Sequence, residues 1–237
     1  MNNPLPFEPL LILTPTRAGL SPEFQANLAQ LPGAIPIFHP GESDISQARQ
    51  IVATLAEEFL QSANPRAQAV RFVLWLDDDM QALPETVAAH MALLERSGLE
   101  AISGRYVQRR AAALAAVLNP DDDGKPVVLE ADDGRGNRVE FLRVWAGLGA
   151  LMLTRRAFLR VCGEALWSEK SPDGRSRRLV CSSSIETLPD GRGRYWPEDF
   201  DFCRRVGDVW LGPLWLRYGH KRERFEYPNA DSAPRLG

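Results

Sequence analysis

Residues 71–80, RFVLWLDDDM, join a short apolar run directly to three acidic residues, Asp77, Asp78 and Asp79. A run of this length, rich in Val, Leu and aromatic residues, predicts a buried strand. Strands of this kind belong to mostly parallel sheets with helices on both faces. Because unpaired charges are costly in a core, the three acids should lie where the strand leaves the sheet. In open α/β sheets that edge binds ligands.

The acidic triplet has two interpretations. Side chains alternate along an extended segment, so Asp77 and Asp79 should project to one side and Asp78 to the other. Two carboxylates on one side can share a hard divalent cation such as Mg²⁺ or Mn²⁺. The other interpretation is an acidic strand end exposed to water. The motif alone leaves both open.

The composition is that of a globular α/β chain. Its 237 residues, of which 44% are hydrophobic, suit one large domain. The formal net charge of −3 gives no reason to expect a nucleic-acid partner. Three cysteines without metal-type spacing fit a reducing compartment, and we expect a cytoplasmic protein. The N-terminus lacks the pattern of a signal peptide, and we expect no membrane span, because every apolar run is too short.

The first 104 residues alternate predicted strands and helices, which is typical of a parallel sheet with crossover helices. One helix should begin at Ser21, a hydroxyl N-cap followed by proline. A second should begin at Asp44, which has capping-box spacing with Gln47, and a third at Leu83. Strands are expected at residues 9–13, 34–38, 71–76 and 100–103.

The second half of the chain has a weaker pattern. Residues 105–119 fit either a helix or an extended segment. Gly147 and Gly149 allow close approach of the backbone to a ligand, or a bulge. Residues 168–194 are polar and contain several glycines, which predicts a long mobile loop. Strands are expected at residues 127–129, 138–144, 209–211 and 214–218, and helices at 154–161 and 200–206.

Five features in sequence order resemble glycosyltransferases of the GT-A fold, in particular the family 2-like bacterial and phage enzymes. They are the loop TPTR at 14–17, the Asp-x-Asp of 77–79, the Gly-x-Gly of 147–149, Glu198-Asp199 opening a helix, and the late Gly219-His220. The resemblance covers about residues 11–220 and leaves 106–137 and 168–193 unmatched. It implies an α/β fold with a mostly parallel central sheet flanked by helices.

The resemblance implies one GT-A-like domain over residues 1–237. Residues 1–104 would form its nucleotide-binding half, and residues 105–237 its sugar and acceptor half. Within the second half, arginines of the loop at about 168–194 could meet the phosphates of a bound donor. These arginines are Arg175, Arg177, Arg178, Arg192 and Arg194.

The resemblance also implies a donor site. Thr14, Pro15 and Arg17 would pack on the nucleotide base and ribose, and Arg49 would lie near the base and phosphates. Asp77 and Asp78 would face the nucleotide. Two further sets complete this site: Gly147 and Gly149 would line the donor-sugar pocket, and Asp77, Asp79 and His220 would hold Mn²⁺ or Mg²⁺.

The acidic pair Glu198 and Asp199 would face the acceptor. An acceptor hydroxyl is a poor nucleophile and needs a positioned base. We favour Asp199 for this role, with Glu198 as the alternative, and expect the helix dipole to keep Asp199 ionised. Taken singly, the two acids could equally cap their helix, and His220 could be an ordinary surface histidine.

The sequence therefore predicts a metal-dependent glycosyltransferase that moves a sugar from a nucleoside-diphosphate donor to an acceptor hydroxyl with inversion, retention staying open. A cation bridging the diphosphate would neutralise the charge that develops as the glycosidic bond breaks. The acceptor, whether glycan, protein or small molecule, stays open. One alternative is a catalytically silent nucleotide-sugar-binding module. Another, a sugar-phosphate nucleotidyltransferase, is disfavoured because residues 14–19, TPTRAG, are not a glycine-rich triphosphate loop.

Overall fold

The structure is a computed structural model that describes residues 9–42, 44–107, 114–121, 123–132, 137–168, 170, 174–221, 225–226 and 235–236. The helices of this part of the chain are α1 (Pro22–Ala29), α2 (Ile45–Gln61), α3 (Pro65–Ala69), α4 (Pro84–Ser97), α5 (Arg155–Glu164) and α6 (Glu198–Val206). Its first strands are β1 (Leu10–Pro15), β2 (Ala34–His39), β3 (Phe72–Leu76), β4 (Met80–Gln81), β5 (Ala101–Ser103), β6 (Ala116–Leu118), β7 (Val128–Asp132) and β8 (Arg138–Ala146). The remaining strands are β9 (Ala150–Thr154), β10 (Ser184–Thr187), β11 (Gly193–Trp196), β12 (Trp210–Leu211), β13 (Gly219–Lys221), β14 (Phe225–Glu226) and β15 (Arg235–Leu236).

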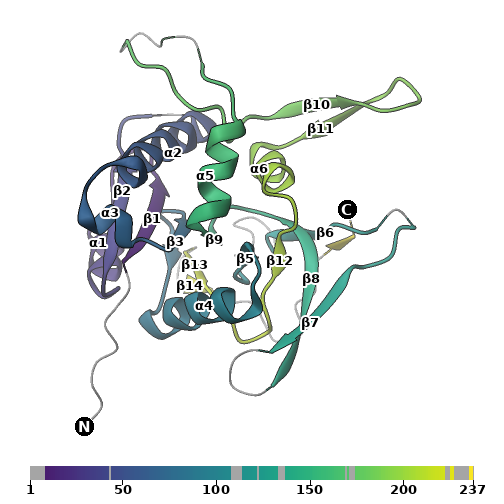
Figure 1. The fold of residues 1–237 in the computed structure, drawn as a ribbon, viewed down its shortest axis with the longest axis horizontal. Helices are drawn as coiled ribbons and strands as arrows, with labels where there is room; N and C mark the ends of the chain where they lie inside the picture. The colour runs from purple at the N-terminus through teal and green to yellow at the C-terminus, as the bar shows by residue number, and fades with distance from the viewer. Residues whose placement is uncertain are drawn as a thin grey trace.

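Ten of the described strands form one mixed sheet (Figure 1). Its order is β15-β6-β8-β12-β5-β9-β3-β1-β2, with β7 paired to β8. Most strands run in one direction, whereas β9 is antiparallel to β3 and β5, and β8 is antiparallel to β12, β6 and β7. The sheet draws strands from both halves of the chain, because β9 lies between β3 and β5.

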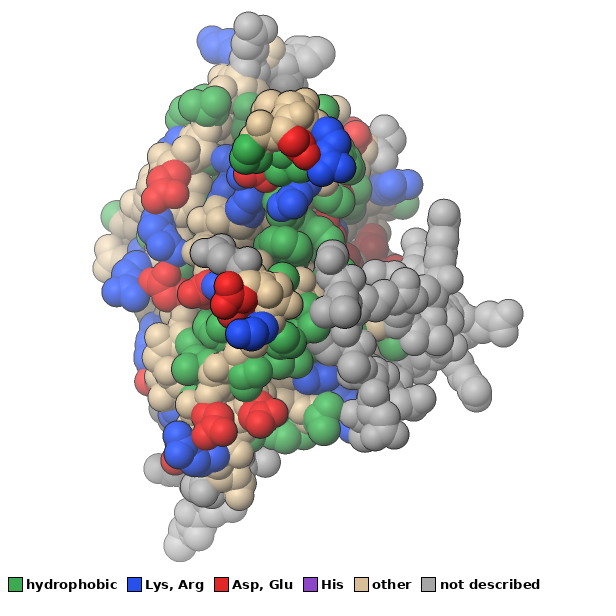
Figure 2. All heavy atoms as spheres, turned by 90° about the vertical axis from the view of Figure 1, so that its right-hand side faces the viewer, with side chains coloured by type: hydrophobic (Ala, Val, Ile, Leu, Met, Phe, Trp, Pro, Cys, Tyr) green, Lys and Arg blue, Asp and Glu red, His purple; other side chains and the backbone are tan. Residues whose placement is uncertain are grey.

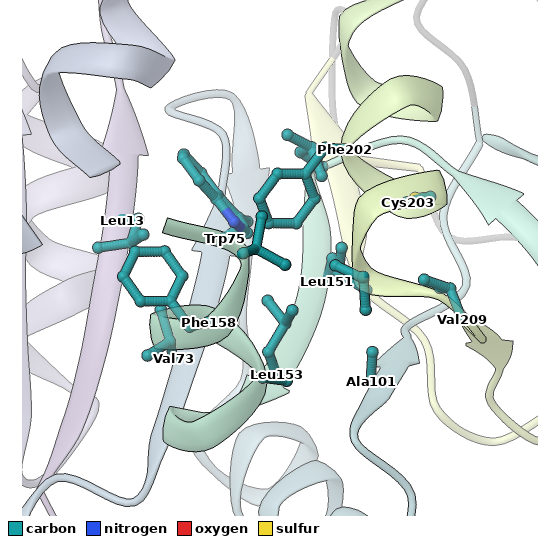
Figure 3. Close-up of a cluster of buried hydrophobic side chains, with 14 of the residues drawn as sticks. Leu13, Val73, Trp75, Ala101, Leu151, Leu153, Phe158, Phe202, Cys203 and Val209 are labelled. Carbon is teal, nitrogen blue, oxygen red and sulfur yellow. The ribbon is translucent and has the colours of Figure 1, made fainter. Parts of the chain in front are cut away.

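The continuous apolar runs of β1 and β3 are buried on both faces of the sheet. Successive side chains alternate: Leu11 and Trp75 join a core cluster with α2, α5 and α6, whereas Ile12 and Leu74 join a cluster with α1 and α4. Figure 3 shows the first cluster, in which Trp75 meets Phe202 of α6 edge to face at 5.7 Å between ring centroids. Helices therefore cover both faces of the sheet, as the sequence predicts.

Local signals in the first half are confirmed. Ser21 caps α1 by accepting a hydrogen bond from the Phe24 amide, and Asp44 caps α2 by accepting from the Ser46 and Gln47 amides. Gly98 ends α4 in the left-handed conformation at φ 69°, which glycine adopts without a steric penalty.

Predictions that depend on tertiary pairing are less accurate. The first four predicted strands run in the same direction, as expected, but β5 is not next to β3, because antiparallel β9 lies between them. Residues 214–218 were expected as a strand, but residues 214–215 form a turn, in which the Leu216 amide donates to the Pro213 carbonyl, and Arg217 forms an isolated β-bridge with Arg105. The predicted helix at 200–206 begins earlier, at Glu198, so that both acids of the pair lie in its first turn.

The segment predicted as a loop at 168–194 contains part of a β-hairpin, β10–β11, which extends away from α6 in Figure 1. Residues 169 and 171–173 of this segment lie outside the described part of the chain. On the face turned to the viewer in Figure 2, acidic and basic side chains are interspersed, in keeping with the small net charge. Within the described residues, none of the helices has both the length and the apolar character needed to cross a membrane.

The buried aromatic contact between α6 and the sheet should dominate stability. Phe202 is fully buried, so Phe202→Ala should lower the free energy of unfolding by about 3–5 kcal/mol through lost contacts and a cavity. Ile185 on the hairpin is 74% exposed, and Ile185→Ala should change the free energy of unfolding by less than about 0.5 kcal/mol. Urea unfolding of both variants tests this, and equal effects would contradict the assigned core.

Candidate functional site

A cavity of about 690 Å³ opens at the carboxyl ends of β1 and β3. Nine of the twelve residues that the sequence assigns to a site line it: Pro15, Arg17, Arg49, Asp77, Asp78, Asp79, Gly147, Asp199 and His220. The other three, Thr14, Gly149 and Glu198, do not line it but adjoin residues that do. The fold therefore brings together side chains that lie more than 200 residues apart in sequence.

The three aspartates form a turn rather than an extended segment, since the Met80 amide donates to the Asp77 carbonyl at 3.0 Å. The expected alternation of their side chains is therefore wrong, and all three line the cavity. The chain then enters β4, which pairs with β13 so that His220 lies opposite Met80. This pairing places the imidazole of His220 beside Asp79.

Arg49 is the buried cation of the site. It projects from the first turns of α2, is 6% exposed, and donates from Nη1 to Glu198 Oε1 at 2.9 Å. Its Nη2 lies 3.7 Å from Asp77 Oδ1. Burial alone would lower the pKa of Arg49, but Asp77 and the other neighbouring acids raise it, so the guanidinium stays charged. Its Nε has no hydrogen-bond partner among the described residues.

Asp77 has an unsatisfied carboxylate oxygen. Its Oδ1 is out of contact with solvent and makes no hydrogen bond within the described part of the chain, the 3.7 Å approach of Arg49 being too long for one. Burial raises the pKa of Asp77 above its usual value, although Arg49 lowers it. Such an oxygen is a chemically suitable ligand for a hard cation. In the described residues, however, no three His, Cys, Asp or Glu side chains are grouped so that they could hold a metal ion by themselves.

His220 has a defined tautomer. Its Nδ1 lies 2.6 Å from the Val107 carbonyl oxygen, which can only accept, so Nδ1 carries a proton. Its Nε2 lies 3.1 Å from Asp79 Oδ2. Burial lowers the pKa of His220, but the hydrogen bond and charge of Asp79 raise it overall. Either Nε2 is protonated and donates to Asp79, or its lone pair faces the carboxylate and a cation must separate the two.

Asp199 and Glu198 differ in environment although they are adjacent. Glu198 is paired with Arg49, whereas Asp199 lines the cavity and accepts from the Phe200 amide at 2.9 Å. Burial raises the pKa of Asp199 to about 6, against the lowering effect of Arg49 and with a further rise from Glu198. Asp199 therefore stays mostly ionised at neutral pH.

Gly147 and Gly149 serve packing against a residue that the sequence did not single out. They lie in the turn between β8 and β9, and a Cβ at Gly149 would come within 2.9 Å of the Tyr106 ring and hydroxyl. A Cβ at Gly147 would overlap the Tyr106 hydroxyl. Tyr106 is buried, lines the cavity, and meets the His220 ring edge to face at 6.0 Å. The Gly-x-Gly pattern was its only sequence signal, because two glycines indicate a bulky neighbour.

The β1 end of the site is only partly as expected. Pro15 and Arg17 line the cavity, with Arg17 exposed. Thr14 is fully buried and its Oγ1 has no hydrogen-bond partner among the described residues. Its contact with a nucleotide stays a prediction.

Three arginines of the 168–194 segment are engaged elsewhere. Arg178 forms a buried ion pair with Glu57 of α2, with 2.8 Å between Nε and Oε2. Arg192 pairs with Asp190 at 2.6 Å, and Arg194 lies over the Trp196 ring. Their expected contact with the phosphates of a donor stays a prediction.

No family model matches the sequence, and no curated protein matches it. Among solved structures, the crystal structure of A197 from STIV matches 96% of this chain and 93% of its own, with a TM-score of 0.53 and 13% sequence identity. At this identity the likeness shows the fold alone. The protein thus has a GT-A-like mixed α/β fold with a mostly parallel central sheet flanked by helices, and the predicted fold class is confirmed.

The charge network predicts a specific stability defect. Arg49→Met leaves Asp77, Glu198 and Asp199 without their shared cation, which should cost about 3–5 kcal/mol at pH 7.5. A carboxyl with a raised folded pKa binds its proton more tightly when folded, so lowering the pH to 5 should return part of this loss.

Urea unfolding at both pH values measures the effect. Arg138, whose side chain is 77% exposed and pairs with Glu130 at 3.5 Å, provides the control, because Arg138→Met should cost less than about 1 kcal/mol. A loss in Arg49→Met that does not depend on pH would exclude charge repulsion as its cause.

Proposed function

We propose that the protein is a glycosyltransferase that moves a sugar from a nucleoside-diphosphate donor to an acceptor hydroxyl, with a divalent cation at the donor site. The observation that carries this proposal is that one cavity brings together two chemically different acidic groups. One is the acidic turn of residues 77–79 with the unsatisfied Asp77 oxygen, and the other is Asp199, a partly buried carboxyl with a pKa of about 6. A fold alone does not specify an activity, so the proposal rests on this site.

The excess of acid in the cavity supports a cation together with an anionic donor. Four aspartates line the cavity, against the cations Arg17 and Arg49 and the imidazole of His220. A bare diphosphate would be repelled by these carboxylates, whereas a diphosphate bound through a cation would be attracted. Mg²⁺ is usually held by one or two carboxylates together with substrate phosphates, without a cage made of protein alone, which agrees with the site.

Asp77, Asp79 and His220 are the residues that would hold the cation. Asp77 offers its unsatisfied Oδ1, and Asp79 and His220 offer oxygen and nitrogen ligands that suit Mn²⁺ as well as Mg²⁺. When bound, the cation would neutralise charge on the departing diphosphate. Arg49 would keep the buried acids in place and add a positive charge beside the phosphates.

Asp199 is our candidate for the general base. A base works best when its pKa lies close to the working pH while its ionised form is still abundant, and a pKa of about 6 meets this condition. Glu198 is less suitable because its carboxylate is held by Arg49. The acceptor would enter beside Pro197 and Phe200, which line the cavity next to Asp199. An inverting reaction needs only this one carboxylate, with retention as the alternative stereochemistry. A silent binding module is the alternative that the experiments below address.

Donor binding should depend on a divalent cation. Calorimetric titration with UDP, GDP, CDP and dTDP should detect one preferred nucleotide in Mn²⁺ and at least 10-fold weaker binding in EDTA, because the acidic turn then repels the diphosphate. Asp79→Ala should remove most of the Mn²⁺-dependent affinity. Asp190→Ala, which removes an exposed carboxylate on the hairpin turn, should leave the Mn²⁺-dependent affinity unchanged. Equal affinity with and without metal would refute the cation site.

Replacing the base should separate an enzyme from a binding module. Asp199→Asn should keep Mn²⁺-dependent nucleotide binding, while sugar transfer or donor hydrolysis falls by roughly 10²–10⁴. In the native protein the base acts only when ionised, so the rate should fall as the pH drops through about 6.

Glu198→Gln is the matched control, since it changes the neighbouring acid and leaves Asp199 intact. Loss of transfer in Glu198→Gln with full activity in Asp199→Asn would move the role to Glu198. Full activity in both would remove the pair from catalysis, and binding without any turnover by the native protein would favour the silent module.

A further inference from the structure

Tyr106 is a buried polar side chain in the cavity that the proposed reaction leaves without a role. It follows β5, is 6% exposed, and lines the cavity with Gly147 and His220. Its ring occupies the space that side chains at Gly147 and Gly149 would need. The absence of side chains at these two glycines thus makes room for the Tyr106 ring, which indicates that its hydroxyl has a fixed position.

The hydrogen bonds of the Tyr106 hydroxyl are incomplete. Its oxygen accepts from the Gly149 amide at 3.0 Å. The hydroxyl can also donate one hydrogen bond, and within the described part of the chain no acceptor is paired with its proton. Burial, followed by the charge of Asp77, raises the pKa of Tyr106 well above its usual value, so the proton is retained at neutral pH. A donor without an acceptor in a buried position is costly unless a bound molecule supplies one.

The order of strands at the carboxyl edge indicates which part of a donor would lie against Tyr106. Along the sheet, β1 is followed by β3, β9 and β5. The acidic turn, where the proposed function puts the diphosphate, follows β3, and the loop of residues 14–17, which the sequence resemblance gives to the nucleotide base, lies at the end of β1. Such a donor would have its nucleotide base at β1 and its diphosphate at β3. Beyond the diphosphate comes the sugar, next to the start of β9 and to Tyr106, which follows β5. The charges of Asp77 and Asp199 both act on Tyr106, as expected for a residue that lies between the diphosphate and the proposed general base, Asp199.

We propose that the Tyr106 hydroxyl donates a hydrogen bond to a hydroxyl group of the transferred sugar and so selects among donor sugars. This inference rests on the proposed function, because it assumes a nucleotide-sugar donor in the cavity. The amide of Gly149 holds the phenol oxygen, and the turn of residues 147–149 thereby orients the proton towards the ligand. The residue would determine sugar specificity without contacting the nucleotide.

The experiment compares sugars that differ by one hydroxyl. Kinetics are measured for the native protein and Tyr106→Phe with UDP-glucose and GDP-mannose, each beside its 2-, 3-, 4- and 6-deoxy analogues, and calorimetry with UDP and GDP is run in parallel. On the donor whose base the protein binds, one deoxy position should cost the native protein about 10-fold or more in kcat/KM. Tyr106→Phe should lower kcat/KM for the parent sugar by the same factor, and removing the sugar hydroxyl at that position should then cause no further loss.

Several outcomes separate this inference from the proposed function. If no nucleoside diphosphate binds, the proposed function fails and the inference with it. If UDP or GDP binds but the deoxy penalties are the same in Tyr106→Phe as in the native protein, the inference is overturned while the donor site stands. A third outcome is that Tyr106→Phe lowers kcat/KM equally for all analogues and also weakens the binding of UDP or GDP alone. That result would show a merely structural role for Tyr106 and would also overturn the inference.

Two further variants cover a folding defect. Tyr218→Phe removes another buried tyrosine hydroxyl, which bonds His90 Nδ1 at 2.9 Å outside the cavity, and should leave the pattern of deoxy penalties unchanged. Gly147→Ala keeps the tyrosine but places a methyl group where its hydroxyl lies. This variant should abolish the same single deoxy penalty, and retention of that penalty would overturn the inference even if Tyr106→Phe does not fold.

Discussion

The candidate site depends on one buried guanidinium surrounded by acids. Arg49 projects from α2 between Asp77, which follows β3, and Glu198, which opens α6. Without a shared cation, these carboxylates would repel one another in a poorly solvated place, and the desolvation of each would be uncompensated. The ion pairs therefore fix the end of a strand and the start of a helix that are more than 100 residues apart in sequence.

One cation does not balance all the acids, and this imbalance gives the site its chemical character. The Nη2 of Arg49 stays 3.7 Å from Asp77, the Asp77 oxygen keeps no hydrogen bond, and the pKa of Asp199 rises to about 6. A folded protein usually satisfies its buried polar atoms, and exceptions concentrate where a ligand completes the network. Burial raises the pKa values of Asp77 and Asp199, and a second positive charge at the acidic turn would stabilise the ionised form of these carboxyls. The cation of the proposed function would supply that charge.

The features that could be predicted from the sequence are those determined by residues close together in the chain. The apolar run before Asp77 and the N-caps at Ser21 and Asp44 each carry a local signal, and each is confirmed. The insertion of β9 between β3 and β5 and the hairpin β10–β11 depend on pairing between distant segments, which periodicity does not encode. Tyr106 was missed for the same reason: only its contact with two distant glycines gives it a place in the site.

The division of roles that we propose for the two adjacent acids follows from their environments rather than from residue type. Glu198 has the longer side chain, which reaches Arg49 and forms a 2.9 Å hydrogen bond. For Glu198 to take a proton from an acceptor, it would have to leave Arg49 and expose that buried cation without its partner. Asp199 is bonded only to the amide of Phe200 among the described side-chain contacts, and its carboxylate lines the cavity at no such cost. Two adjacent carboxyls in different environments can thus divide structural and chemical work, and under the proposed function the ion pair with Arg49 gives Glu198 the structural part.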